Sequence, residues 1–244
     1  MKRIIILLPF LLTSFFLYSF TFEPISTNYT PSGPRSNQVF RISNNETSRI
    51  AVKISVTTRE TDLEGNEVNN PADDLFMIYP SRTMLNPGET RSVRVKWLGE
   101  QDPDVEIPFR IIAEQIPVDF NPTERTEGGG IRLSYKYIGN IYILPVGGKP
   151  EVVIDSFELN RDELTLMLDN QGTRHTVLAN LSVTIVSNEG EKIYSLTEEE
   201  VAPGSGINLL TGFPRKIIFT LNSETVELLK NDGWEVAIDF DPVF

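Results

Sequence analysis

Residues 131–145 show the clearest pattern of hydrophobic and polar positions in the chain. Odd positions from 131 to 143 read Ile, Leu, Tyr, Tyr, Gly, Ile and Ile, whereas even positions from 132 to 142 read Arg, Ser, Lys, Ile, Asn and Tyr. This period of two predicts a β-strand with one apolar face over residues 131–144, between a glycine-rich loop and Pro145. Such a strand can complete its own sheet, or it can offer its edge and apolar row to another chain.

Short strands separated by turn residues are predicted along almost all of the remaining chain, because alternation and β-branched or aromatic residues recur between Gly, Pro and Asn positions. The first half has predicted strands at 22–30, 38–42, 50–58, 76–79, 91–97, 109–116 and 131–144. The second half has predicted strands at 152–159, 163–168, 176–186, 192–196, 207–211, 216–221 and 234–240, and one helical turn at 223–230 that Ser223 would cap. About seven strands in each half predict an all-β fold of two immunoglobulin-like β-sandwich domains in tandem. We expect them at residues 21–145 and 151–244, with a linker at 146–150.

The first 20 residues differ from everything that follows. Lys2 and Arg3 precede a nearly unbroken apolar run from Ile4 to Tyr18, and Ser19 is the best small residue near its end. This order predicts a secretory signal peptide at residues 1–20. The alternative is a membrane anchor, but the run is shorter than the roughly 20 apolar residues that a spanning helix needs. We therefore expect export, with no membrane insertion after the signal peptide is cleaved.

Composition narrows the range of partners and chemistry. The chain has 22 basic and 34 acidic residues, which argues against nucleic acid or anionic lipid as a partner. Cysteine is absent, so the fold has no disulfides and depends on the packing of its apolar residues, 40% of the chain. Thiol chemistry and cysteine-ligated metals are excluded.

No arrangement of residues predicts catalysis, a metal site or a cofactor. The single histidine, His175, lies in a polar turn, where we expect it to hydrogen-bond the backbone. Glu198, Glu199 and Glu200 are expected to form a solvated loop. The three glycines at 128–130 lack the lysine and the following helix of a phosphate-binding loop. The sequence therefore predicts a binding protein and no enzyme.

Residues 75–97 combine an apolar pair, a proline, a stretch that ends in Pro-Gly and an alternating strand with an arginine. This combination resembles the central segment of periplasmic pilus chaperones. Residues 109–117 resemble the next strand, which ends in Glu-x-Ile-Pro, and residues 41–45 resemble an early strand that ends in Asn. Residues 166–178, with Asn170 and His175, resemble the archaic branch of the family. The likeness covers nearly the whole chain after the signal peptide.

The resemblance implies a mechanism called donor-strand complementation. A pilus subunit is a sandwich that lacks its last strand, and the chaperone lends its own strand to the open groove. By resemblance, Ile131, Leu133, Tyr135 and Tyr137 are the row that fills the groove. The alternative is that this row covers its own core, which we expect for Ile141 and Ile143. Capping of the same edge by a second copy is a further expectation, and the resemblance implies no cofactor.

The resemblance also implies that two basic residues between the domains anchor the C-terminal carboxylate of the subunit. In an ungapped comparison, these positions fall on Asn28 and Asn140. Asparagine donates hydrogen bonds but carries no charge, and neutral hydrogen bonds are roughly half as strong as charge-assisted ones. Lys136 has the strand parity of Asn140, so we expect it to supply the cation, with Arg35 and Arg132 as alternatives.

The sequence thus predicts a periplasmic chaperone that stabilises pilus subunits and delivers them to an outer-membrane usher. One alternative is an immunoglobulin-like structural or adhesive envelope protein whose long strand closes its own sheet. Another is a carbohydrate-binding module, which would need a row of exposed aromatic residues. Trp97 and Trp234 are expected in the cores of separate domains instead.

Overall fold

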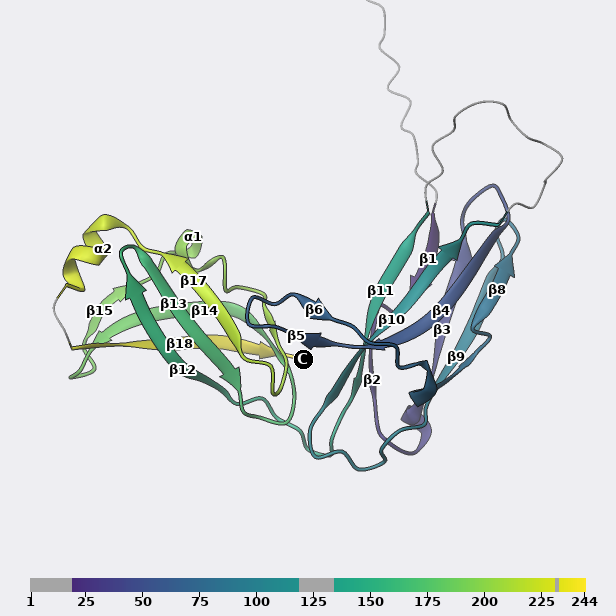
Figure 1. The fold of residues 1–244 in the computed structure, drawn as a ribbon, viewed down its shortest axis with the longest axis horizontal. Coiled ribbons are helices and arrows are strands. Elements are labelled where there is room, and N and C mark those ends of the chain that lie inside the picture. The colour runs from purple at the N-terminus through teal and green to yellow at the C-terminus, as the bar shows by residue number, and fades with distance from the viewer. Residues whose placement is uncertain (1–18, 119–133, 231–232) are drawn as a thin grey trace, which may run out of the picture.

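The computed structural model describes residues 19–118, 134–230 and 233–244, and it places two β-sandwiches side by side (Figure 1). In the first sandwich, one sheet has the order β1 (Phe20–Glu23), β3 (Asn37–Asn44), β9 (Thr90–Trp97) and β7 (Phe76–Tyr79). The other has the order β2 (Ser26–Tyr29), β11 (Lys136–Ile143), β10 (Ile107–Ile116), β4 (Ile50–Thr58) and β8 (Arg82–Leu85). Short 3-10 turns, η1 (Pro34–Ser36) and η2 (Asp73–Leu75), connect strands of this domain.

The second sandwich is built from residues 152–243. One sheet has the order β12 (Val152–Asn160), β13 (Glu163–Asn170) and β17 (Arg215–Thr220). The other joins β15 (Lys192–Ser195), β14 (Thr176–Ser187) and β16 (Asn208–Leu209), and β18 (Trp234–Val243) also pairs with β14. The short helices α1 (Glu198–Val201) and α2 (Ser223–Leu228) complete the domain. The predicted all-β fold of two tandem sandwiches is confirmed.

Each sandwich has its own core, because the inward-facing residues of its two sheets pack against each other. The first core contains the fully buried Phe40, Val93, Phe109 and Ile141, and the second contains Leu166, Leu178, Val183 and Phe219. None of the helices in the described part of the chain is long and apolar enough to cross a membrane.

The segment 22–30, predicted as one strand, is two strands in different sheets. Pro24, which has no N–H for a strand ladder, lies between them, so β1 pairs with β3 and β2 pairs with β11. Phe20 begins β1 and is fully buried, although the expected signal peptide includes it. Cleavage after Ser19 would preserve this packing.

Two local predictions in the second domain were wrong. Residues 198–200, expected as a loop, begin helix α1, because Thr197 and Glu200 form a reciprocal capping box. Helix α2 is capped by Asn222, whose side chain accepts from the N–H of Thr225, and Ser223 is its first residue.

A separate two-stranded hairpin, β5 (Glu60–Thr61) and β6 (Glu67–Val68), extends from the end of β4. Its strands pair only with each other and belong to neither sheet of the first sandwich. In Figure 1 the hairpin lies between the two domains, and the backbone N–H of Lys216 on β17 donates to the carbonyl oxygen of Leu63 at its tip, at 2.8 Å. The hairpin therefore contacts both domains.

Candidate functional site

One edge of β11 is only partly covered. The whole strand pairs with β10, from Lys136 to Ile143. On its other side β2 runs parallel and pairs only with residues 140–143. Among the described residues, no strand pairs with the outer edge of residues 136–139. This stretch offers backbone groups to which an incoming strand could bind.

The odd row of β11 runs from the first core to its rim. Ile141 and Ile143 are fully buried, as the sequence predicted for them. Tyr135 and Tyr137 are half-buried and pack against the core cluster. The ring of Tyr137 meets that of Phe20 edge-on, with centroids 4.8 Å apart, and its hydroxyl donates to the carbonyl oxygen of Phe20 at 2.6 Å.

The other two members of the predicted donor row, Ile131 and Leu133, lie outside the described residues. Tyr135 and Tyr137 face the interior of their own sandwich while each keeps some exposed surface. An added strand along this edge would extend the same interior, because side chains on one face of neighbouring strands point the same way.

The even row of β11 lies on the opposite face of the sheet. Lys136 is exposed, Ile138 is 47% exposed, Asn140 is half-buried and Tyr142 is buried. Arg110 on β10 is the register partner of Asn140, so the two side chains share this face. Charge and burial therefore both change along the row, from an exposed lysine to a buried tyrosine.

The three residues expected to anchor a carboxylate share this face but do not all meet. Asn28 on the parallel neighbour β2 aligns with Tyr142, whereas Asn140 aligns with Ser26. Lys136 precedes Asn140 by four residues, which is roughly 13 Å along a strand. The two asparagines are therefore diagonal neighbours on adjacent strands, and Lys136 lies farther along the sheet.

Two guanidinium groups, here called the arginine pair, stand beside Asn140 instead. Arg110 donates to Oδ1 of Asn140, and its Nε donates to Oε2 of Glu67 at 2.9 Å. Arg59 donates from Nε to Oε1 of the same carboxylate at 2.9 Å, and from Nη1 to the hydroxyl of Tyr142 at 2.7 Å. One carboxylate therefore lies between two cations, whose side chains are 9% and 18% exposed.

The arginine pair keeps Glu67 ionised. Partial burial alone would raise the pKa of this carboxyl group, but the hydrogen bonds and charges of Arg110 and then Arg59 outweigh it and hold the pKa of Glu67 below its usual range. The cluster has one more positive than negative charge, so it favours the approach of a second anion.

A second polar cluster joins the two domains beside Tyr142. Nδ1 of His175 lies 2.7 Å from Oε2 of Glu106, and the two side chains are 5% and 1% exposed. The imidazole also stacks on the ring of Tyr142, with centroids 3.9 Å apart and planes 13° from parallel. Asn208 donates to the hydroxyl of Tyr142 at 2.9 Å. The prediction that His175 bonds the backbone of its turn was wrong, because folding brings Glu106 and Tyr142 of the first domain against that turn.

Comparison with known proteins identifies the family. A family model described as "Pili and flagellar-assembly chaperone, PapD N-terminal domain" matches residues 24–145. The chain belongs to this family. Its role as a pilus-assembly chaperone follows from that membership, and the family is a non-enzymatic one.

Solved structures agree with this assignment at the level of the fold. A chain from the chaperone–tip adhesin complex of CFA/I fimbriae biogenesis is 15% identical, with a TM-score of 0.60 over 91% of this chain and 94% of that one. The class 5 fimbriae chaperone CfaA is 13% identical, with a TM-score of 0.58 over 91% and 100%. A chain of the CsuC–CsuE pre-assembly complex of Acinetobacter baumannii is 13% identical, with a TM-score of 0.52 over 81% and 89%. No curated protein sequence matches the chain.

Three residues of this chaperone shape the site but were not predicted from the sequence: Arg59, Arg110 and Tyr142. Arg110 is a charged residue between Phe109 and Ile111 in a predicted strand, which indicates a polar strand face but names no partner. Arg59 and Tyr142 give no comparable signal. Arg59 contacts the hairpin and Tyr142 contacts the second domain. No local sequence pattern relates either of these elements to β10 or β11.

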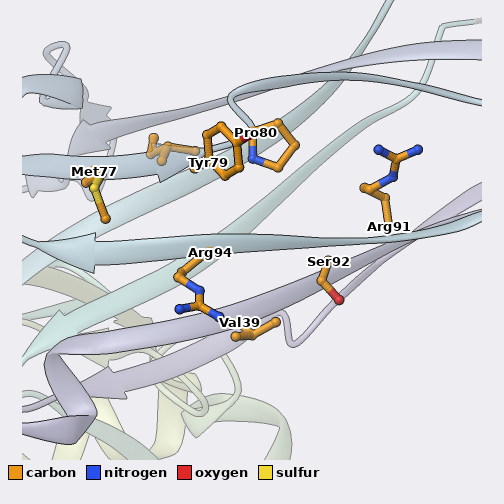
Figure 2. Close-up of a pocket in the computed structure, with 8 residues that line it drawn as sticks. Val39, Met77, Tyr79, Pro80, Arg91, Ser92 and Arg94 are labelled. Atoms are coloured by element: carbon orange, nitrogen blue, oxygen red, sulfur yellow. The ribbon is translucent and has the colours of Figure 1, made fainter.

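The chaperone also has a hollow on the outer face of its other sheet. Strands β3, β7 and β9 line it, and the hollow, which is open to solvent, has a volume of about 780 Å³. Figure 2 shows Tyr79 and Pro80 along one side, with Arg91 and Arg94 on the neighbouring strand. Tyr79 is 75% exposed. This hollow lies on a different sheet from β11 and shares no residue with the arginine pair.

Proposed function

We propose that this chaperone stabilises pilus subunits by donor-strand complementation in the periplasm and then delivers them to an outer-membrane usher. The observation that carries the proposal is the open outer edge of residues 136–139, continuous with the predicted strand 131–144. An extended subunit segment that pairs with this edge would gain main-chain hydrogen bonds, and alternate apolar side chains of the chaperone would fill its groove.

The donor row is proposed to comprise Ile131, Leu133, Tyr135 and Tyr137. Each well-buried apolar side chain contributes about 1.5 to 3 kcal/mol. Tyr135 and Tyr137 already pack at the rim of the chaperone's own core, so they would connect that core to the interior of the subunit. A second copy of the chaperone pairing with the same edge is proposed for the protein without subunit.

Export is proposed from the apolar run that follows Lys2 and Arg3. Cleavage after Ser19 would leave Phe20 at the start of the mature chain, where it is buried in β1. We propose that the mature protein has domains at residues 21–145 and 151–244, preceded by Phe20 and joined by the linker 146–150.

The test is co-purification from periplasm of the chaperone and the small secreted proteins encoded beside it. We expect a 1:1 complex with wild type and its loss in the Ile131→Asp/Leu133→Asp double variant. Loss of two apolar contacts should cost about 3 kcal/mol or more, which is at least about 100-fold in Kd.

Ser134→Asp is the matched control, because Ser134 lies in the same segment with the opposite strand parity and is exposed. It should retain the complex. If wild type gives no complex, the alternative of a structural or adhesive envelope protein is favoured. If the double variant binds as wild type does, the donor row lies elsewhere.

A carboxylate anchor is proposed on the face that carries Asn28 and Asn140, with Lys136 as the cation expected from the sequence. Lys136→Ala tests this assignment directly. Unchanged subunit binding would remove Lys136 from the anchor and leave the cation to another residue on this face.

A further inference from the structure

The β5–β6 hairpin presents a carboxylate to the face that carries Asn140. Glu67 is on β6 and aligns with Thr61 on β5. Asp62 closes the turn, since its Oδ1 accepts from the N–H of Asn66 at 2.7 Å. The hairpin thus satisfies much of its own backbone and turn, and it is joined to the sheet below through Arg59 at its base and through Glu67.

The contact of Glu67 has the geometry of bound carboxylate recognition. Both carboxylate oxygens accept from Arg110, which is a two-point contact of the kind that guanidinium groups form with carboxylates. Arg59 adds a third hydrogen bond, at 2.9 Å. The arginine pair is therefore already arranged to bind a carboxylate, and in this structure its own hairpin supplies that group.

The same hairpin is also tied to the second domain. Beyond the backbone bond from Lys216 to Leu63, the ammonium group of Lys216 pairs with the carboxylate of Glu64. Glu64 and Lys216 have side chains that are 53% and 34% exposed, so this pair is solvated and weak. Release of Glu67 would leave the hairpin held mainly at its base and by these contacts at its tip.

We propose that Glu67 is an internal occupant of a carboxylate site formed by Arg59 and Arg110, and that the C-terminal carboxylate of a subunit displaces it. This inference rests on the proposed chaperone function and refines it. The site lies beside Asn140, where the sequence led us to expect an anchor but showed no cation. The arginine pair supplies the missing charge, and the free protein covers that charge until a subunit binds.

Displacement gives a definite consequence for affinity. For a ligand that binds only when Glu67 has left, the apparent Kd equals the intrinsic Kd divided by the fraction of molecules in that open state. If a tenth of the molecules are open, removing the competitor tightens binding about tenfold. Loss of Arg110 acts in the opposite direction, because the incoming carboxylate then loses its two-point partner.

The test measures the Kd of the co-purified subunit for four chaperones: wild type, Glu67→Gln, Arg110→Gln and Glu64→Gln. We expect at least threefold tighter binding for Glu67→Gln and at least tenfold weaker binding for Arg110→Gln. Glu64→Gln is the matched control, since it removes a carboxylate from the same hairpin without touching the arginine pair. Its Kd should stay within twofold of wild type.

A second subunit, with one serine added after its C-terminal residue, shows whether the carboxylate is the group that is recognised. The added residue shifts the carboxylate, so Glu67→Gln should no longer tighten binding. Glu67→Asp supplies a further measurement should the glutamine variant not fold, because its shorter side chain keeps the charge but weakens the contact. It should bind more tightly than wild type by a smaller factor.

The outcomes separate the inference from the proposed function. A wild-type complex whose Kd is unchanged in both Glu67→Gln and Arg110→Gln overturns the inference and leaves the chaperone function standing. Equal tightening by Glu67→Gln and Glu64→Gln also overturns it, since a general charge effect then explains both. Absence of any complex with wild type overturns the proposed function, and the inference with it.

Discussion

Tyr142→Phe tests whether a single hydroxyl couples the two domains. The hydroxyl accepts from Arg59 at 2.7 Å and from Asn208 of the second domain at 2.9 Å, while the ring stacks on His175. Phenylalanine keeps the ring and removes only the acceptor. A hydrogen bond from a charged donor contributes about 1.5 to 3 kcal/mol and a neutral one about 0.5 to 1.5 kcal/mol. We therefore expect a loss of about 2 to 4.5 kcal/mol in the free energy of unfolding.

The assay is urea unfolding followed by tryptophan fluorescence, since Trp97 and Trp234 report separately on the two domains. Two-domain proteins need not unfold in one step, so the shape of the transition is part of the result. If wild type unfolds in one transition, the variant should unfold in two, because the domains have lost a shared contact.

Tyr137→Phe is the control for this experiment. Its hydroxyl bonds the carbonyl oxygen of Phe20 within the first domain, so its removal should cost about 1 kcal/mol and leave the number of transitions unchanged. A loss below about 0.5 kcal/mol for Tyr142→Phe, or the same behaviour as Tyr137→Phe, would refute the proposed coupling.

Three further predictions concern the same region and the first core. Gly139→Ala should lower stability by about 1 to 3 kcal/mol in thermal or urea unfolding, because its Cβ would lie 2.6 Å from the carbonyl oxygen of Ile25, a backbone atom; an unchanged midpoint would mean that the neighbouring chain moves freely. Because the pKa of Glu67 is lowered in the folded protein, this carboxylate should stabilise the fold at pH values above the ordinary glutamate pKa of about 4.3. That stabilisation should be lost as the pH falls through the folded-state pKa. The stability gap between wild type and Glu67→Gln should therefore close in acid, and a gap that persists there would contradict an ionic role. Asn44→Ala should cost about 2 to 3 kcal/mol, because its fully buried amide bonds two backbone carbonyl oxygens, whereas the exposed neighbour Asn45 should tolerate alanine by the same measurement.

Alternation along the chain was sufficient to predict most strands. The strand at 50–58 was predicted with the bounds that the structure gives to β4, and 76–79 with those of β7. These segments are predictable because a sandwich strand buries every second side chain, so apolar and polar residues alternate along its sequence. The prediction of a single strand at 22–30 was wrong, because the two parts of this segment pair with different sheets.

The burial of Ile141 and Ile143 was predictable for the same reason, since strand parity decides which side chains share a face. The donor row and the carboxylate anchor were expected from the resemblance, and both stay predictions. Asn28 and Asn140 were named as anchor positions from the resemblance, and Lys136 was favoured as the cation on strand parity alone. Parity says which side a residue faces and nothing about the 13 Å or so that separates it from a neighbour four positions away.

The sequence by itself determined the two-sandwich fold, the family resemblance and the polar and apolar faces of β11. Only the tertiary structure decided that Arg59 and Arg110 share the carboxylate of Glu67, and that His175 meets Glu106 across the domains. The physical reason is one of range. Burial along a strand repeats every two residues, so neighbouring positions reveal it. The contacts of Glu67 and His175 join elements that are far apart in the chain with no periodic signal between them, and they form only when those elements pack together in the folded protein.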